Sequence, residues 1–559
     1  MSRPSDTGGQ SAYAFKPHER PFMPGSPATP DHPARRRVAY LLIGVYLALT
    51  GGFQNGLLLA NLTTIQGSLA LTPVEAGWIT VAFNMTNACM SIILFKARQQ
   101  FGVERFVRFT VFLLLLANLI QLFDAGYHVE LIARGISGIA ASGISTLAIF
   151  YLMQGVPPKA KIASVLIGMG LSQVAIPLAR AISPLLLESG DVAILFQLQF
   201  AMSLIAFGLV NFLHLPPGET VRAFEKLDFI SFPLLAIGIG LLSAFLVQGR
   251  VEWWDTPWLG YALAAAIITI GAAFLIEHNR ANPMLQTRWM RSREVVALAI
   301  TAALVRVLLS EQNFGATGLM TAVGMTNDQL VTYYWIVTAA TVLGLLVSII
   351  RLDPQDLQRP VIAAILIIAV AAFIDTGAST LTRPVNIYWT QAAIAFAAVY
   401  FLGGLMLEGI MRAISRGPAY LVSFIAVFGL SQALGGLIGT AALSTFHTIR
   451  TKAHLMAIGS ELSLADPIVA QAVQQRAAAY GGTLGDAALR QASGAGQIVQ
   501  QASREATVLA FNDVFFVIGV AASITFVLMF AVWLNNRRRG INPLANELAA
   551  LQAMMTKGQ

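Results

Sequence analysis

Long apolar stretches separated by short polar segments fill almost the whole chain after residue 37. A helix needs about 20 mostly apolar residues to cross the hydrocarbon core of a membrane. Fourteen stretches approach or exceed this length, so the pattern predicts an all-α membrane protein with fourteen spans. The predicted spans are residues 38–63, 74–95, 106–126, 129–153, 162–187, 192–214, 229–249, 257–277, 295–322, 329–350, 360–379, 387–411, 418–445 and 511–535.

The positive charges favour one orientation of these spans. Lys and Arg gather in alternate loops, above all in residues 96–108, 215–228 and 278–294, and the last span is followed by Arg537, Arg538 and Arg539. Positively charged loops stay on the cytoplasmic side of a membrane. The unbroken alternation therefore predicts an even number of spans, with both termini in the cytoplasm.

Composition supports the same class and excludes several others. Only 11% of the 559 residues are charged, against about a quarter in soluble domains, while 56% are hydrophobic. The net charge of +8 lies mostly in the loops, so we expect no nucleic-acid partner. Cys89 is the only cysteine, the seven histidines are scattered, and no phosphate-binding loop occurs. We therefore expect no metal, no cofactor and no enzymatic activity.

Two segments depart from the apolar pattern. Residues 1–37 are rich in Pro, Gly, Ser and charge before the first span and predict a disordered cytoplasmic tail. Residues 446–510 are rich in Ala and Gln and predict two polar, mostly helical arms outside the membrane. These arms are either a tolerated insertion or a docking site for a partner. Residues 536–559 predict a second cytoplasmic tail.

Ionisable residues deep in the predicted spans are candidates for function. Each costs roughly 2.5–3.5 kcal/mol near the centre of a membrane helix, so such residues usually face a protein interior or a watery cavity. Arg306 and Glu311 lie well inside the ninth span, about 140° apart around the helix, and should not pair with each other. Glu311 is therefore either a proton carrier or one half of a permanent clamp to an Arg on another helix.

Two further arginines complete this set. Arg180 lies in the outer half of the fifth span and Arg134 near the start of the fourth. With Arg306, Arg180 leaves the predicted cavity net positive, which favours an anionic or weakly acidic amphipathic ligand. Glu408 and Arg412, four residues apart at the inner end of the twelfth span, predict a structural ion pair.

Several segments together resemble a known family. Ala76–Asn87 is similar to its second helix, Arg134–Gly138 to the R-x-x-x-G core of its fourth helix, and Asn282–Arg293 to its central loop. Leu434–Thr440 and Phe511–Phe515 resemble its glycine motif and the end of its long outer loop. The family is the fourteen-helix drug:proton antiporters of the major facilitator superfamily, of the EmrB/QacA type, and the similarity covers nearly the whole chain after the tail.

This resemblance implies an architecture, a localisation and partners. It implies a multi-pass protein of the cell inner membrane that exports amphipathic small molecules in exchange for protons. It also implies a periplasmic membrane-fusion adaptor and an outer-membrane channel as partners. The implied units are an N-terminal six-helix bundle (38–214), two additional helices (215–294) and a C-terminal six-helix bundle (295–535).

The resemblance implicates Arg134 in proton coupling, and the depth of Glu311 in the ninth span adds this residue to the same role. We expect the substrate to be held in the cavity by Arg180, Arg306 and the polar residues Gln54 and Asn55. The adaptor would dock on the outer arms, at Arg450, His454, Gln474 and Gln497.

The chain departs from the family pattern at three positions. Gln54 stands where an acid often occurs in the first helix, Gln99 replaces the Asp of the cytoplasmic G-x-L-x-D-x-x-G motif, and Arg180 replaces a Gly in the fifth helix. These changes leave two alternatives open. One is a proton-driven importer of an organic anion, and the other is a membrane scaffold or sensor that does not transport.

Overall fold

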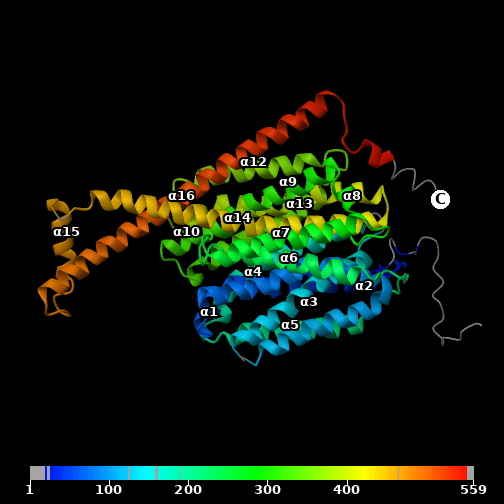
Figure 1. Ribbon diagram of the computed structural model, residues 1–559, viewed down its shortest axis with the longest axis horizontal. Helices are drawn as coiled ribbons and strands as arrows, with labels where there is room; N and C mark the ends of the chain where they lie inside the picture. The colour runs from blue at the N-terminus through cyan, green and yellow to red at the C-terminus, as the bar shows by residue number, and fades with distance from the viewer. Residues whose placement is uncertain are drawn as a thin grey trace, which may run out of the picture.

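A computed structural model describes residues 19, 21, 25–123, 126–157, 161–188, 190–463 and 465–549 (Figure 1). Most of the first predicted tail and the end of the second lie outside these ranges. The described chain is helical, with one isolated β-bridge between Pro27 and Gly218. Its elements are α1 (Ala34–Ser68), α2 (Pro73–Gln121), α3 (Tyr127–Gly155), α4 (Lys161–Leu186), α5 (Ala193–Phe212), α6 (Asp228–Gln248), α7 (Pro257–His278), α8 (Thr287–Met290), α9 (Arg293–Leu308), η2 (Glu311–Ala316), α10 (Thr317–Ala322), η3 (Asn327–Leu330), α11 (Val331–Ile350), α12 (Gln358–Asp375), η4 (Pro384–Ile387), α13 (Tyr388–Ile414), α14 (Pro418–Glu461), α15 (Pro467–Ala478) and α16 (Ala487–Arg538).

Eleven helices of the described chain are long and apolar enough to cross a membrane. α2 and the run α9–η2–α10 are not among them. α2 is 49 residues long and is broken only at Gly102, whose φ of +84° suits a residue without a Cβ. Residues 96–108, predicted as a loop, are therefore helical on both sides of a kink, which is a correction. Two spans in α2 and one in α9–α10 would give fourteen, and this count stays a prediction.

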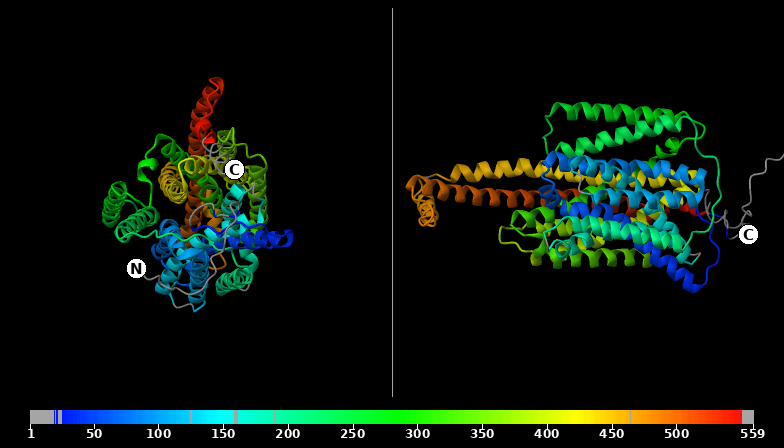
Figure 2. Two further views of the ribbon diagram at one scale, coloured as in Figure 1. Left: turned by 90° about the vertical axis from the view of Figure 1, so that its right-hand side faces the viewer. Right: turned by 90° about the horizontal axis from the view of Figure 1, so that it is seen from below.

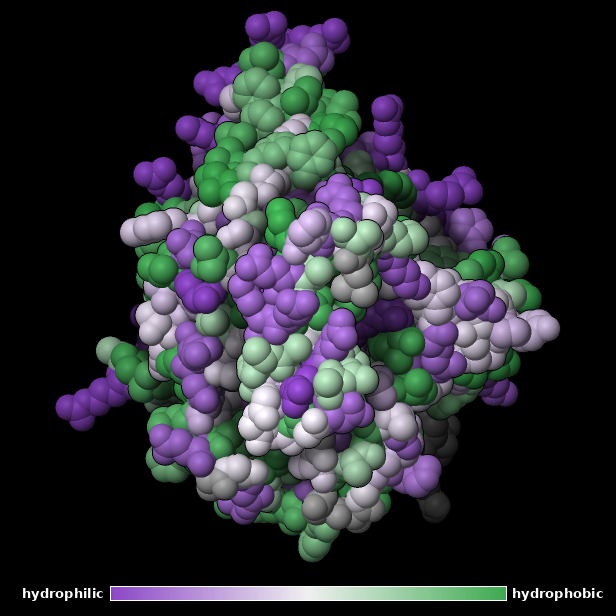
Figure 3. Space-filling model, turned by 90° about the vertical axis from the view of Figure 1, so that its left-hand side faces the viewer, coloured by the Kyte–Doolittle hydropathy of each residue, from purple (hydrophilic) through white to green (hydrophobic). Residues whose placement is uncertain are grey.

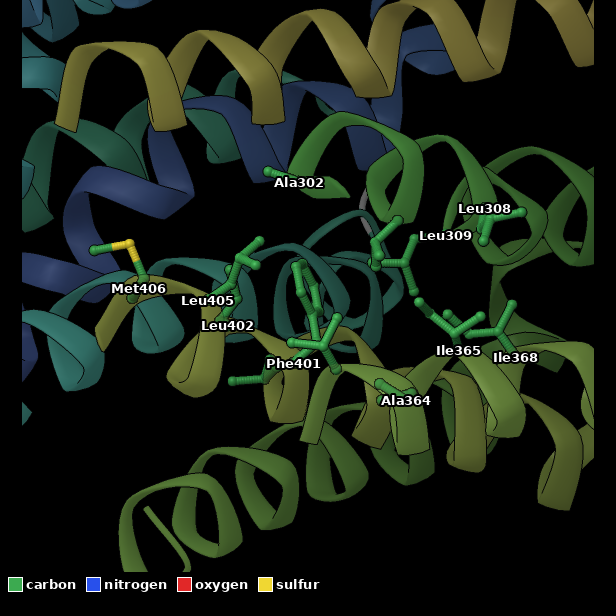
Figure 4. Close-up of a cluster of buried hydrophobic side chains, with 14 of the residues drawn as sticks. Ala302, Leu308, Leu309, Ala364, Ile365, Ile368, Phe401, Leu402, Leu405 and Met406 are labelled. Atoms are coloured by element: carbon green, nitrogen blue, oxygen red, sulfur yellow. The ribbon is translucent and has the colours of Figure 1, made fainter. Parts of the chain in front are cut away.

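The two predicted bundles occur as two packed halves. α1 to α5 pack on one another, α9 to α16 do the same, and the halves meet mainly where α4 packs on α11. A large apolar cluster from α9, α12 and α13 forms the core of the C-terminal half; Leu309, Ile365 and Phe401 belong to it (Figure 4). α6 and α7 form a pair at the side of the bundle rather than between its halves (Figure 2).

A buried ion-pair network fastens this additional pair to the N-terminal half. Asp228, at the start of α6, binds Lys96 of α2 at 2.8 Å and Arg280, just after α7, at 2.8 Å. Arg280 also binds Glu225 at 3.0 Å and Glu277 at 2.7 Å. Arg280 and Asp228 are almost fully buried, so each charge depends on its partners.

Part of the predicted disordered tail is packed against the protein, which corrects that prediction for the described residues. Ala28 is fully buried, and its N–H donates to the carbonyl of Pro217 at 3.0 Å. Its own carbonyl accepts a bond from Gln154 Nε2 at 2.9 Å. Residues 25–33 therefore join the linker between the bundles to the end of α3.

The predicted polar arms are helical and project from one end of the molecule. α14 and α16 run out of the bundle side by side and are closed by α15, at the end opposite α8 (Figures 1 and 2). Seen from that end, hydrophilic residues lie over much of the centre of the face, with hydrophobic patches between them (Figure 3).

Candidate functional site: a central cavity beside a buried carboxyl pair

A cavity lies where the two halves meet, with about 580 Å³ of space between its walls, part of it open to the outside. It is lined by residues of α4, α9, η2, α10, α11 and α13 and by the junction between α9 and η2. Arg180 and Arg306 are its only charged lining residues in the described chain, so its walls carry two positive charges and no acid. The lining residues are Gln173, Ile176, Pro177, Arg180, Arg306, Leu309, Gln312, Asn313, Thr317, Tyr333, Tyr334, Val337, Thr341, Ala398 and Val399.

The two arginines come from different halves. Arg180, on α4, donates through Nη1 to Thr317 Oγ1 at 2.9 Å and to the Tyr334 hydroxyl at 3.3 Å. Its guanidinium also lies 5.4 Å from the centre of the Tyr334 ring, within reach of a cation–π contact. Arg180 therefore bridges the N-terminal half to α10 and α11 of the C-terminal half.

Arg306 depends on a close approach between α9 and α14. A Cβ on Gly435 would stand 2.7 Å from the Ala303 carbonyl oxygen and 3.0 Å from Arg306 Cβ, so only glycine fits there. The glycine motif of α14 thus provides the room in which the Arg306 side chain lies. The structure describes no hydrogen bond from the Arg306 guanidinium to a described residue, and this leaves its donors open to a ligand.

Glu311 lies behind the cavity wall, in a segment of π-helix. Its side chain is fully buried at the first residue of η2. π-Helical turns are rare and occur frequently at functional sites. Gln391 of α13 donates through Nε2 to Glu311 Oε1 at 2.9 Å and to Asp375 Oδ2 at 2.8 Å. One amide nitrogen therefore holds two carboxyl groups, from η2 and from the end of α12.

The two carboxyl groups lie close together, because Glu311 Oε1 and Asp375 Oδ2 accept hydrogen bonds from the same nitrogen, Gln391 Nε2. Glu311 Oε2 is buried and finds no donor among the described residues. Two carboxylates in one dry site cannot both ionise without strong repulsion. Such a pair favours a state in which one of the two carboxyl groups is protonated.

A chain of hydrogen bonds joins the pair to the cavity. Gln312 Nε2 donates to the Gln391 carbonyl at 2.9 Å and to Gln391 Oε1 at 3.3 Å. The Tyr333 hydroxyl donates to the same Oε1 at 3.5 Å. Gln312 and Tyr333 both line the cavity, so Gln391 is hydrogen-bonded to two cavity residues as well as to the carboxyl pair.

Arg134 lies in a separate network in the N-terminal half. Its Nη1 donates to the Gln54 carbonyl at 2.6 Å, its Nη2 to Asn55 Oδ1 at 3.5 Å, and its guanidinium lies 4.6 Å from the Phe83 ring. Gln54 is fully buried and accepts a bond from Ser137 at 3.2 Å. Gln54 and Asn55 thus contact Arg134 and are not among the residues that line the cavity of Arg180 and Arg306.

The four residues assigned to adaptor docking differ in how exposed they are and in what they bind. Arg450 and His454 of α14 both bind Asp513 Oδ2 of α16 at 2.6 Å, so they tie the two arms together at their base. Gln497 Nε2 donates to the Tyr480 hydroxyl at 2.7 Å. Gln474, on α15, is exposed.

Sequence reasoning missed Asp375 and Gln391. A signal for Asp375 was present, since it is the only acid within the predicted span 360–379. Gln391 carried no such signal, because a neutral amide at the start of an apolar stretch is common at a helix end. Within the described chain, no group of three or more His, Cys, Asp or Glu could hold a metal ion.

Comparisons with known proteins agree with this architecture. No protein-family model matches the sequence. The chain is 22% identical over 503 residues to the multidrug export protein EmrB of Escherichia coli, covering 84% of this chain and 90% of that protein. It is 23% identical over 452 residues to the MFS-type transporter YhcA of Bacillus subtilis, covering 78% and 80%.

Solved structures share the fold at low sequence identity. The human organic anion transporter MFSD10 matches with a TM-score of 0.53 at 13% identity, over 88% of this chain and all of that one. The tetrameric transporter PepTSo2 matches with a TM-score of 0.52 at 12% identity, over 90% and 99%. The chain is therefore similar in sequence to the multidrug export protein EmrB and to an MFS-type transporter, and it shares the fold of the solved transporter MFSD10.

Proposed function

We propose that the chain is a proton-coupled exporter of amphipathic small molecules in the cell inner membrane. The observation that supports this best is the buried pair of Glu311 and Asp375, joined by Gln391 to a cavity with two arginines. Transporters of this superfamily rock two halves about a central site. The hydrogen bond from Arg180 to Thr317 crosses the interface between the halves, so we expect it to break and re-form as the halves move.

The chemistry of the cavity favours an amphipathic anion or weak acid as substrate. Two guanidinium groups offer charge-assisted hydrogen bonds, and Ile176, Leu309 and Val337 supply apolar walls. An anion leaving a cell with a negative interior is also driven outward by the membrane potential. Export of such a substrate in exchange for a proton would be driven by both the proton gradient and the membrane potential.

A test uses proteoliposomes that contain the purified full chain and the amphipathic anion 1-anilinonaphthalene-8-sulfonate as probe. An imposed pH gradient should drive probe transport, and an ionophore that collapses the gradient should stop it. Transport that continues unchanged after collapse would remove the proton from the scheme.

One observation favours import as the alternative. A bound anion beside the carboxyl pair favours the protonated form of the pair, because protonation removes a negative charge next to the anion. Anion and proton would then bind together and cross the membrane in the same direction. Antiport instead requires that substrate binding expel the proton through the change of conformation. The direction of proton movement on probe binding therefore separates the two.

We further propose that the α14–α16 arms dock a periplasmic membrane-fusion adaptor that leads to an outer-membrane channel. The arms project from the body and carry exposed apolar side chains, including Met456, Ile468 and Leu489. Deletion of residues 455–505 should abolish capture of a purified periplasmic membrane-fusion adaptor while leaving membrane insertion intact. Capture that survives the deletion would contradict this role, and deletion of residues 540–549 at the opposite end serves as the control.

A further inference from the structure

A second cavity lies between the halves, toward the end of the bundle that holds the Lys96–Asp228–Arg280 network. It has about 1110 Å³ of empty space, part of it open to the outside, and shares no lining residue with the central cavity. Its walls are almost entirely apolar and come from α2, α3, α4, α13 and α14. The lining residues are Ser91, Leu94, Phe95, Arg98, Phe106, Thr146, Ile149, Phe150, Met153, Lys161, Val165, Ile410, Ile414, Leu421, Val422, Ile425 and Ala426.

Arg98 is the unusual member of this wall. Its side chain is 6% exposed, and its guanidinium lies 4.6 Å from the centre of the Phe150 ring and 4.9 Å from that of Phe95. Its Nε is buried with no hydrogen-bond partner among the described residues. Cation–π contacts offset part of the desolvation of the charge, but they leave the Nε donor without an acceptor.

The other charged group in this wall is also positive. Lys161 donates to Thr29 Oγ1 at 2.8 Å, and burial lowers its pKa. No Asp or Glu occurs among the lining residues that the structure describes. A buried cation without an acid partner in an apolar cavity is costly unless an anion joins it.

We propose that this cavity binds an amphipathic monoanion, with its charged head on Arg98 and its apolar body between α3, α13 and α14. The binding itself is independent of the proposed function, and only its role as a first station for exported substrate rests on that function. The head is a carboxylate or a phosphate, so the ligand is either a free amphipathic acid or an anionic lipid of the bilayer.

Binding of radiolabelled palmitate to the purified full chain, in nanodiscs of phosphatidylcholine, tests the proposal. Unlabelled palmitate, methyl palmitate and hexadecyltrimethylammonium serve as competitors with the same chain length. Arg98→Gln removes the charge, Arg98→Lys retains it, and Ile425→Trp narrows the apolar wall. Arg105→Gln removes an exposed cation near the same end of the molecule and is the matched control.

We expect palmitate to compete at least about tenfold better than its methyl ester, because a hydrogen bond to a charged group discriminates by this amount. Arg98→Gln should lower palmitate affinity by about tenfold or more, Arg98→Lys should retain most of it, and Arg105→Gln should have no effect. Ile425→Trp should weaken palmitate and ester alike. Equal competition by ester and acid, or unchanged palmitate binding in Arg98→Gln, would overturn the proposal.

Two further arms separate the ligand sources and the two proposals. The first arm adds phosphatidylglycerol to the nanodiscs and measures palmitate binding again. A fall in wild type, but not in the residual binding of Arg98→Gln, would show that the site accepts lipid headgroups as well as free acids. Glu311→Gln should bind palmitate normally even though it does not transport. If palmitate binding depends on Arg98, the second site holds even when proton-coupled transport is not found. If palmitate does not bind, the proposed roles of the central cavity and the carboxyl pair are unaffected.

Discussion

The two halves of the molecule bury charge in opposite ways. In the N-terminal half, Arg134 donates to the Gln54 carbonyl and to Asn55 and lies over Phe83. The buried acid Glu130, one helical turn away on α3, also interacts with it electrostatically, so a permanent cation is held by fixed partners. In the C-terminal half, Glu311 and Asp375 share the donors of one amide, and Glu311 Oε2 has no donor in the described chain.

The difference separates a fixed charge from an exchangeable one. An arginine keeps its proton at any physiological pH, so its network can only hold the fold or move as a unit. Two carboxyls in one site must share a proton, and this proton can leave when the surroundings change. We therefore propose a structural role for the N-terminal network and proton exchange for the C-terminal pair.

The largest effect is expected from Glu311→Gln. The amide cannot exchange a proton, so transport of the probe driven by a pH gradient should fall to the level of empty liposomes. The folded protein should remain, because the glutamine carbonyl still accepts from Gln391. Glu188→Gln, at an exposed acid, is the control. Gradient-driven transport by Glu311→Gln at the wild-type rate would contradict the assignment of proton exchange to the C-terminal pair.

Asp375→Asn should impair the same step. If the two carboxyls act as a unit, gradient-driven transport by Asp375→Asn should also fall to the level of empty liposomes. Initial rates for wild type and the two single variants measure this. An Asp375→Asn protein that transports at the wild-type rate would show that the carboxyls do not act together.

Arg134→Gln should act on stability rather than on proton exchange. It removes a buried donor from the Gln54 carbonyl, and a buried polar group left unsatisfied costs about 1–3 kcal/mol. Thermal unfolding of the purified protein should show this loss, with Arg105→Gln unchanged. A stable Arg134→Gln protein that transports without a pH gradient would instead make Arg134 part of the coupling.

Arg180→Gln and Arg306→Gln should each weaken binding of the anionic probe by about tenfold, because each removes a charge-assisted hydrogen bond. A neutral probe of similar size should be affected little. Probe titration by fluorescence measures both. Equal weakening for anionic and neutral probes would indicate a change in cavity shape rather than a loss of charge recognition.

The smallest effect concerns the network that fastens α6 and α7. Hydrogen bonds from Arg280 and Asn282 hold the pKa of Glu225 below its ordinary value. Glu225 therefore stabilises the fold at neutral pH, and this contribution is lost as the pH falls through the lowered pKa. Melting temperatures between pH 7 and pH 3 should fall more for wild type than for Glu225→Gln. Parallel curves would contradict this.

The sequence predicted the architecture because membrane helices are specified by local apolar length. It also identified Glu311, Arg180 and Arg306, since a charge within an apolar stretch is conspicuous. It could not find the partner of Glu311, because Asp375 ends its own helix and Gln391 is neutral, and only packing of η2, α12 and α13 brings the three together. The docked residues 25–33 were missed because their polar composition gives no sign of their hydrogen bonds to the bundle.

Proton release on ligand binding tests the carboxyl pair most directly. The purified protein, in weak buffer with a pH indicator, is titrated with 1-anilinonaphthalene-8-sulfonate. The proposed exporter predicts release of about one proton for each probe bound in wild type and none in Glu311→Gln. Proton uptake would favour the importer. No exchange in wild type, or the same release from Glu311→Gln, would contradict the assignment of the proton to this pair.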